Sequence, residues 1–223
     1  MLIVLLALVV VVGIPYVVIK HMGVGIRRGA RRDDGVIGLS FDDGPDPIAT
    51  PRVLDELARA GVRATFFVSG DAVAAHPELV LRAVAEGHEV CSHGYRHQHA
   101  LFQRWPLTGY ADTRRAIREL EALTGKTRWY RGPHGAYSWS VLAAAHVCRV
   151  SPVNWTVEAH DWHPEYTPAR VVGKVLAEAR TGGVIVMHDG GRGGVRSVHA
   201  LAPVLAGLVE RGLRAVPLGE LWP

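Results

Sequence analysis

The stretch VIGLSFDDGP, residues 36–45, sets the interpretation of the whole chain. Its first six residues form a short, mostly apolar run of strand length, and two adjacent carboxylates, Asp42 and Asp43, follow directly. Gly44 and Pro45 then favour a turn. One carboxylate of such a pair can bind a metal ion while its neighbour takes a proton. By itself, however, an Asp-Asp-Gly-Pro sequence is more often a plain turn, so its meaning depends on its surroundings.

Outward from this stretch, short apolar runs alternate with helical patterns. We expect strands at 36–41, 64–68, 89–92, 128–130, 152–157, 184–187 and 213–217, and helices at 51–60, 77–86, 110–123, 140–145, 169–179 and 198–211. This alternation is typical of parallel β/α units, and about six or seven units are fewer than the eight of a closed barrel. The predicted fold class is therefore α/β, a distorted and incomplete (β/α) barrel, in which ligands bind at the carboxyl ends of the strands.

The composition is that of a globular domain that follows an apolar N-terminus. Of the 223 residues, 48% are hydrophobic and 21% are charged, which is close to the usual globular mixture. The formal charge is +4, but five of the basic residues come just after the apolar N-terminus: Lys20, Arg27, Arg28, Arg31 and Arg32. The remaining body is nearly neutral, which argues against a nucleic-acid-binding protein.

The first 22 residues are predicted to be a membrane anchor, followed by a basic linker at 23–35 and a catalytic domain at 36–223. Residues 2–19 carry no charge, and as one transmembrane helix at ~1.5 Å per residue they would reach about 27 Å. A cleaved signal peptide and a buried core strand are the alternatives. The basic residues after the helix favour a cytoplasmic domain, whereas the chemistry below favours the extracytoplasmic side.

Two histidines follow the third expected strand. His93 and His97 are four residues apart, and on a helical turn both rings would face one cation. Together with Asp43 they form an oxygen, nitrogen, nitrogen set, which is typical of catalytic metal sites that keep a position for water. His99 is a further candidate ligand. Two solvated histidines are the alternative, because this spacing by itself is weak evidence.

Three more strand ends carry polar or aromatic side chains. Arg131 follows the fourth expected strand and can fix a carboxylate through two hydrogen bonds. Asp161 and Trp162 come after the fifth strand, and His188 follows the sixth, where it could equally be a satisfied core histidine. Because the carboxyl ends of parallel strands share one rim, we expect all these side chains to meet there.

In this order, the strand ends resemble the motifs of the polysaccharide deacetylases of the NodB-homology type, carbohydrate esterase family 4. The resemblance covers about residues 36–218 and rests on five segments: Ser40-Phe41-Asp42-Asp43-Gly44-Pro45, His93 to His97, Arg131-Gly132-Pro133-His134-Gly135, Glu158 to Trp162 and Ile185-Val186-Met187-His188. The family's fold, a distorted (β/α) barrel, agrees with the number of units. Three positions depart from the common family pattern: His134 replaces tyrosine, Glu158 replaces aspartate and Ile185 replaces leucine.

The resemblance implies a role for each matching residue. The implied metal ligands are Asp43, His93 and His97. The implied catalytic residues are Asp42 as the base, Arg131 holding Asp42, His188 as the acid and Asp161 tuning His188. The implied substrate contacts are the backbone N–H of His134 at the oxyanion, Trp162 in the pocket wall and Ile185 against the acetyl methyl.

The expected activity is metal-dependent hydrolysis of the N-acetyl group of N-acetylglucosamine-type residues in an envelope or extracellular polysaccharide or oligosaccharide, with release of acetate. Zn²⁺ is the expected ion, and Co²⁺, Ni²⁺ and Mn²⁺ also suit an Asp-His-His set. The expected partners are an N-acetylated amino-sugar polymer or oligomer and, through the N-terminal helix, the cell membrane. The protein is expected to be single-pass, with its catalytic domain on the extracytoplasmic side and without a nucleic-acid partner.

Two other functions compete with this prediction. A catalytically inactive, glycan-binding member of the same fold predicts a broken ligand or base, and none is broken in the sequence. Another metal hydrolase, acting on a phosphoester or a cyclic amide, would ordinarily need a second metal or a basic clamp, and the strand ends offer Arg131 alone. The sequence leaves open whether the polymer is peptidoglycan, a chitin-like oligosaccharide or an exopolysaccharide, and it leaves the oligomeric state open.

Overall fold

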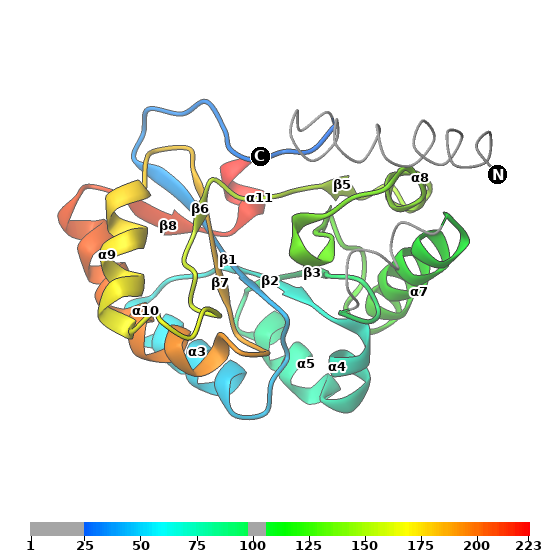
Figure 1. Cartoon of the computed structure of the whole chain (residues 1–223), viewed down its shortest axis with the longest axis horizontal. Coiled ribbons are helices and arrows are strands. Elements are labelled where there is room, and N and C mark those ends of the chain that lie inside the picture. The colour runs from blue at the N-terminus through cyan, green and yellow to red at the C-terminus, as the bar shows by residue number, and fades with distance from the viewer. Residues whose placement is uncertain (1–24, 98–105) are drawn as a thin grey trace, which may run out of the picture.

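The computed structural model describes residues 25–97 and 106–223. Its centre is a parallel sheet in the order β5-β4-β3-β2-β1-β7-β6, with β8 paired to the first half of β1 (Figure 1). The strands are β1 (Val36–Asp42), β2 (Thr65–Val68), β3 (Glu89–Ser92), β4 (Trp129–Tyr130), β5 (Ser151–Pro152), β6 (Val157–Glu158), β7 (Val184–His188) and β8 (Arg214–Val216). The order ends at β5 on one side and at β6 on the other, so the predicted incomplete α/β barrel is confirmed.

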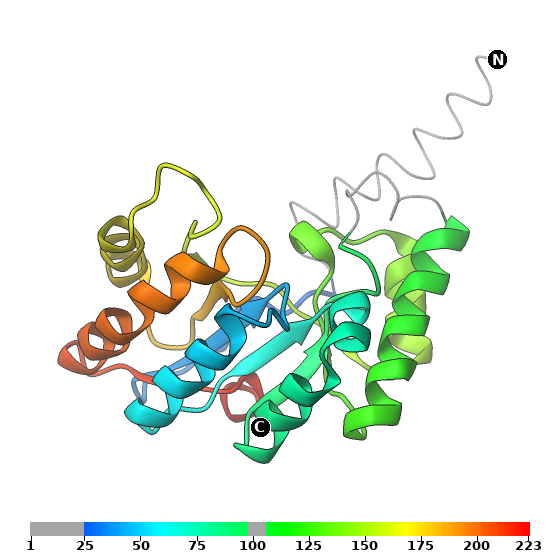
Figure 2. The ribbon, with the colours of Figure 1, turned by 90° about the horizontal axis from the view of Figure 1, so that it is seen from below.

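Helices pack against this sheet, most of them on its outer face. They are α3 (Ala49–Ala60), α4 (Gly70–Ala75), α5 (Pro77–Ala85), α7 (Pro106–Thr124), α8 (Trp139–Val147), α9 (Pro168–Glu178), α10 (Gly194–Glu210) and α11 (Leu218–Leu221), with a 3-10 turn at η2 (Pro133–Gly135). Figure 2 shows the longer helices side by side across one face of the sheet. Every helix expected from the sequence is present, whereas the short helices α4 and α11 were not predicted.

Local sequence explains the helix boundaries. Thr167 precedes α9, and its hydroxyl accepts the N–H of Arg170, while Pro168 occupies the first helical position. Helix α3 ends at Gly61, whose φ of 64° lies in the left-handed region that glycine adopts without steric cost. These signals are short-range, which is why the helices could be placed from the sequence.

The alternation of side chains along β1 separates two buried regions. Leu39 and Phe41 face the helices and belong to the largest hydrophobic cluster, which draws on α3, α9 and α10. Val36, on the opposite face, belongs to a second cluster with Phe67 and Trp129. All seven residues of β1 are buried, so polar side chains on this strand must be paired or used.

The predicted strand at 152–157 is wrong, because these residues form two short strands at opposite ends of the sheet. β5 pairs with β4, whereas β6 pairs with β7. A single strand cannot join the two ends of an open sheet without closing it. The chain therefore leaves the ladder between them, where the N–H of Asn154 donates to the carbonyl of Arg27 at 2.7 Å.

The described part of the predicted basic linker is packed against the domain. Ile26 is 8% exposed and belongs to a cluster with Ile117. Arg27 forms a parallel bridge with Val153, and the N–H of Ala30 donates to the carbonyl of Gly182 at 2.8 Å. This segment therefore reaches from the β5 side of the sheet to the start of β7, and the folded body begins before residue 36.

The predicted membrane anchor, residues 1–22, lies outside the described residues. Between residues 25 and 97 and from residue 106 onward, the structure contains no helix that is both long and apolar enough to cross a membrane.

Candidate active site

The carboxyl ends of β1 and β7 lie side by side and carry Asp42 and His188. The two residues are register partners in neighbouring strands, so their side chains lie on the same face of the sheet. Arg131, which follows β4, is completely buried, and its Nη1 donates to Asp42 Oδ1 at 2.7 Å and to Ser40 Oγ at 2.9 Å. Ser40 in turn donates to the carbonyl of Ile185 at 2.7 Å. This buried network fixes the orientation of the Asp42 carboxylate.

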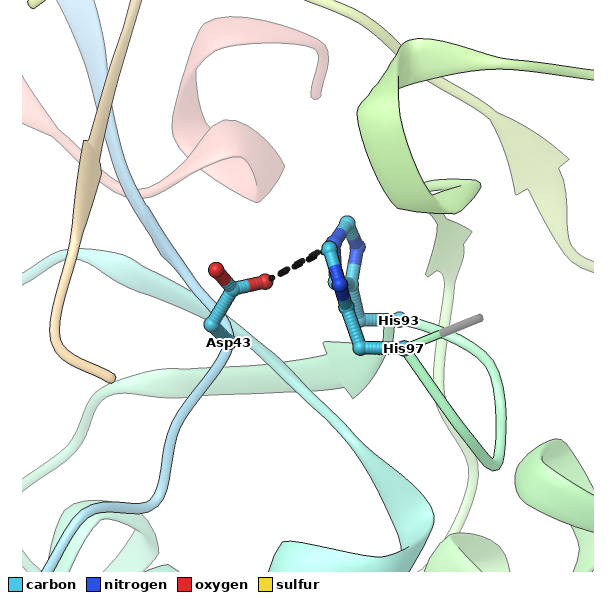
Figure 3. A group of neighbouring side chains, drawn as sticks. All are labelled: Asp43, His93 and His97. Carbon is cyan, nitrogen blue, oxygen red and sulfur yellow. Dashed lines mark ion pairs between the residues drawn. The ribbon is translucent and has the colours of Figure 1, made fainter. Parts of the chain in front are cut away.

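Asp43 faces the two histidines that follow β3 (Figure 3). Its Oδ1 lies 3.3 Å from His93 Nε2 and 3.2 Å from His97 Nε2. Ligand atoms from the three residues all lie within 4.8 Å of one another. Two ligands at 2.0–2.1 Å from a tetrahedral Zn²⁺ are about 3.3 Å apart, so the observed distances suit such an ion. The structure thus brings together the three residues that the sequence predicts as ligands.

The polar atoms of this cluster also fit a bound cation. Asp43 Oδ1, which faces both histidines, is buried without a hydrogen-bond partner among the described residues, an arrangement that costs free energy unless another group satisfies it. Burial raises the pKa of the Asp43 carboxyl, but the nearby imidazole of His93 outweighs burial, and the pKa lies below its usual range. Burial lowers the pKa of His97, which favours the neutral ring that binds metals.

The two histidines do not lie on a helical turn, and this part of the prediction is wrong. His93 follows the end of β3, and the chain continues through Gly94, whose φ is 87°, into a non-helical loop. The rings nevertheless stack, with centroids 5.5 Å apart. His99, the further candidate ligand, lies outside the described residues.

Asp161 and His188 form a second buried polar group. His188 Nδ1 lies 2.6 Å from Asp161 Oδ1, and the other carboxylate oxygen accepts the backbone N–H of His188 at 2.8 Å. The buried hydroxyl of Ser197, on α10, also donates to that second oxygen. Burial lowers the pKa of His188, but the charge and hydrogen bond of Asp161 outweigh it and raise the pKa to about 10. The imidazole is therefore protonated at neutral pH and can act as an acid.

His134 borders the metal cluster, and Trp162 directly follows Asp161 in the chain. The His134 ring is exposed and makes an edge-on contact with the His97 ring, with centroids 4.5 Å apart. His134 also has a φ of 57°, so its backbone occupies the left-handed region that non-glycine residues seldom adopt, and such strain is often found at functional sites. Trp162 is 40% exposed, and its Nε1 donates to Glu158 Oε1 at 3.1 Å.

Ile185 does not line the site, which corrects the role that the resemblance implies for it. The side chain is completely buried and packs in the cluster between the sheet and the helices. Ile185 and His188 are three residues apart on β7, and alternation along a strand places them on opposite faces. Val186 is on the same face as His188, so it is the apolar residue of β7 that this face offers to a substrate.

The sequence reasoning did not identify several residues that support the site. Ser40 accepts a hydrogen bond from Arg131, and Ser197 donates one to Asp161. Asp189 is fully buried behind the Asp-Asp-Gly-Pro turn, and its Oδ2 accepts the hydroxyl of Thr50 at 2.6 Å. Burial raises the pKa of Asp189 to about 7, with an opposing contribution from the Thr50 hydrogen bond.

Gly44 is required beside this carboxylate, because a Cβ at position 44 would collide with it. The adjacent His188-Asp189 pair in the sequence was a signal for a second acid at this rim. A serine or threonine within a helix gives no comparable signal, since most such residues have other uses.

The comparisons with known proteins agree with this site. A family model described as polysaccharide deacetylase matches residues 29–153. A chitooligosaccharide deacetylase from Bradyrhizobium sp. is 36% identical over 196 residues, which are 82% of this chain and 89% of the relative. A peptidoglycan-N-acetylglucosamine deacetylase from Bacillus cereus is 32% identical over 200 residues, 85% of this chain and 89% of the relative. The chain belongs to the polysaccharide deacetylase family, a class of hydrolases that cleave the carbon–nitrogen bond of an N-acetyl group.

Solved structures of the same fold include active and inactive members. The Bc1960 peptidoglycan N-acetylglucosamine deacetylase superimposes with a TM-score of 0.83 at 27% identity, covering 92% of this chain and 97% of that protein. A mutant of BA3943, described as a CE4 family pseudoenzyme with restored enzymatic activity, superimposes with a TM-score of 0.76 at 26% identity, covering 87% and 70%. Because a pseudoenzyme shares this fold, the fold alone does not show that a chain is catalytically active, and activity requires intact site residues.

Proposed function

We propose that this chain hydrolyses the N-acetyl group of N-acetylglucosamine-type residues in a chitin-like oligosaccharide or in peptidoglycan, with one divalent ion held by Asp43, His93 and His97. The observation that carries the proposal is the intact three-ligand cluster beside two candidate proton-transfer groups, the buried Asp42 and the largely buried His188. The substrate class is supported by the relatives named above, which deacetylate chitooligosaccharide and peptidoglycan. An inactive, glycan-binding member would not need all five of these residues in place.

The residues of the site divide the reaction among them. When bound, a divalent ion supplies the Lewis acidity that polarises the acetyl carbonyl. Asp42, oriented by Arg131, accepts the proton of the attacking water. The backbone N–H of His134 is our candidate donor to the oxygen on which negative charge develops. His188, kept protonated by Asp161, gives its proton to the departing amine, so that acetate and a glucosamine-type amine are released.

We assign Zn²⁺ as the ion. One carboxylate oxygen and two imidazole nitrogens are the ligand types of catalytic zinc sites, and the 3.2 and 3.3 Å separations suit its tetrahedral geometry. The same ligand types accept Co²⁺, Ni²⁺ and Mn²⁺, so metal analysis of the purified protein is the direct test.

The deciding experiment measures acetate released from chitooligosaccharides and from peptidoglycan by the purified protein. We expect release from at least one of the two, complete loss of release after treatment with a chelator, and recovery when Zn²⁺ is added back. Absence of acetate from both substrates in the zinc-loaded protein would contradict the proposal and favour an inactive glycan-binding member. Release that persists after the metal has been removed would contradict the metal-dependent mechanism.

We further propose a location at the cell membrane, with a single N-terminal span and the catalytic domain on the extracytoplasmic side. This is supported by the uncharged run at 2–19 and by the envelope position of the relatives' peptidoglycan substrate. Fusing alkaline phosphatase, which is active only outside the cytoplasm, to the C-terminus tests the orientation. An inactive fusion beside an active cytoplasmic reporter would reverse the assignment.

A further inference from the structure

The loop from His93 to His97 depends on other elements for its position. His93 follows β3 directly, its side chain is 2% exposed, and its N–H donates to the carbonyl of Val68 at 2.8 Å. The His97 side chain is 35% exposed and lies beyond the non-helical part of the loop. The sheet therefore fixes His93, whereas the position of His97 opposite Asp43 depends on how residues 94–96 are held.

One side of this loop is held by the start of α4. The N–H of Gly70 donates to the carbonyl of Gly94 at 2.9 Å, and the N–H of Asp71 donates to the carbonyl of Tyr95 at 2.9 Å. The Tyr95 ring packs so closely on Gly70 that a Cβ at position 70 would collide with it. These contacts satisfy the carbonyl groups of Gly94 and Tyr95. The N–H of Gly94 donates to Ser92 Oγ at 3.4 Å, whereas the N–H of Tyr95 has a partner on another element.

That partner is Asp112, on α7. Its Oδ2 accepts the N–H of Tyr95 at 2.9 Å, across 17 positions of sequence. The carboxylate is half-buried and approaches Gly94 closely, since a Cβ at position 94 would lie 3.3 Å from the same oxygen. From the same helix, the Arg115 guanidinium lies 3.5 Å from the centroid of the Tyr95 ring. Helix α7 thus holds both the backbone and the side chain of Tyr95.

We infer that Asp112 is a positioning residue of the metal site, whose carboxylate fixes the backbone of residues 94–96 and thereby holds His97 opposite Asp43. The inference rests on the proposed metal site. Asp112 touches neither the ion nor the substrate, and it lies outside the sequence segments that carry the family resemblance. Its effect is expected on the affinity for the ion, because outer partners that orient ligands typically change metal affinity about 10- to 100-fold.

The test compares Zn²⁺ affinities of full-length variants in detergent, measured by competition with a chromophoric chelator. We expect Asp112→Ala to weaken Zn²⁺ binding about 10- to 100-fold. Asp112→Asn retains an oxygen acceptor for the Tyr95 N–H, so it should bind Zn²⁺ within about threefold of wild type, since a neutral acceptor is weaker than a charged one. Glu78→Ala removes a carboxylate whose side chain is 66% exposed on α5, and it serves as the matched control with wild-type affinity.

The possible outcomes distinguish a failure of the role of Asp112 from a failure of the proposed metal site. Wild-type affinity in Asp112→Ala overturns the inference alone. An Asp112→Asn variant as weak as Asp112→Ala also overturns it, because charge rather than the hydrogen bond would then matter. A wild-type protein that binds no Zn²⁺ overturns the proposed metal site and the inference with it. If Asp112→Ala does not fold, Asp112→Ser, which is too short to reach the Tyr95 N–H, is measured instead with the same expectation.

Discussion

The proposed proton-transfer half of the site is buried in the sheet, whereas two of the three residues in the proposed metal half reach the same rim from a turn and a loop. The side chains of Arg131 and Asp42 are 0% and 4% exposed, and those of Asp161 and His188 are 0% and 14% exposed. In the proposed metal half, the His93 side chain is only 2% exposed, but those of Asp43 and His97 are 19% and 35% exposed. The first half is fixed by strand register and buried hydrogen bonds, so it is preorganised without a ligand. In the second half the sheet fixes His93, whereas Asp43 and His97 depend on turn and loop contacts and, when the site is loaded, on the ion.

The largest effect is expected when Asp42, the proposed catalytic base in the buried half, is replaced. Asp42→Asn retains the shape of the side chain and an oxygen for Arg131 but cannot take a proton. We expect kcat/KM for acetate release to fall about 10³-fold, within the range for general-base catalysis, while bound zinc remains stoichiometric. The assignment of the base would be contradicted by a rate within threefold of wild type in the zinc-loaded variant.

A second change tests the half that depends on the loop. His97→Ala removes a proposed ligand from a partly exposed position. We expect Zn²⁺ affinity to fall by more than the about 10- to 100-fold typical of an outer partner, with a Tm close to that of the wild-type protein. His93→Ala should weaken Zn²⁺ binding similarly but should also lower Tm, because that ring is 2% exposed. Equal Tm losses in the two variants, measured by calorimetry of the metal-free proteins, would remove the distinction between a strand-fixed and a loop-held ligand.

A third change separates the proton on His188 from its position. In Asp161→Asn the charge that raises the pKa of His188 to about 10 is lost. We expect kcat at neutral pH to fall about 100-fold and the alkaline limb of the pH–rate profile to move to lower pH. A profile that keeps its alkaline limb in this variant would show that another group sets the proton on His188.

The same pair predicts a pH dependence of stability in the metal-free protein. The pKa of His188 is raised from its ordinary value of 6.5 to about 10 in the folded state. The Asp161–His188 pair therefore contributes stability that is fully present below about pH 6.5 and is lost as pH rises through about 10. Between these pH limits, the free energy of unfolding measured with denaturant should fall more steeply with pH in the wild-type protein than in Asp161→Asn. Equal pH dependence in the two proteins would contradict the pairing.

The smallest effect tests the placement of Ile185. Because its side chain packs between the sheet and the helices, Ile185→Val should lower the free energy of unfolding by about 1 kcal/mol and leave kcat and KM unchanged. Val186→Ala, on the face that carries His188, should instead raise KM for the acetylated substrate. A change in KM for Ile185→Val without a loss of stability would restore the role implied by the family resemblance.

Several features of the site could be predicted from the sequence because they depend on short stretches. The strand at 36–41 and the residues that follow it were identified from an apolar run and a turn signal. Asp43, His93 and His97 could be grouped because parallel strands deliver their carboxyl ends to one rim. The sequence also predicts that Ile185 and His188 lie on opposite faces of the strand, since side chains alternate between the two faces.

Other features could not be obtained in this way because their partners are distant in sequence. Ser197 meets Asp161 across 36 positions, and Asp112 meets Tyr95 across 17. Nothing local marks either residue, because serine and aspartate have ordinary uses on helix surfaces. The division of 152–157 into two strands likewise follows from the open sheet, whose two ends must be connected by one chain segment.

For this protein the sequence alone determined the fold class, the family and most of the polar residues at the rim, because hydrophobic periodicity, turn residues and motif order depend on short stretches of chain. The tertiary structure decided which of these residues are buried, which face of β7 meets the site, and how the segment before residue 36 packs against the domain. It also decided which groups hold the loop between His93 and His97, namely the start of α4 and Asp112 of α7. These properties arise from contacts between elements far apart in sequence, and such contacts exist only once the chain has folded.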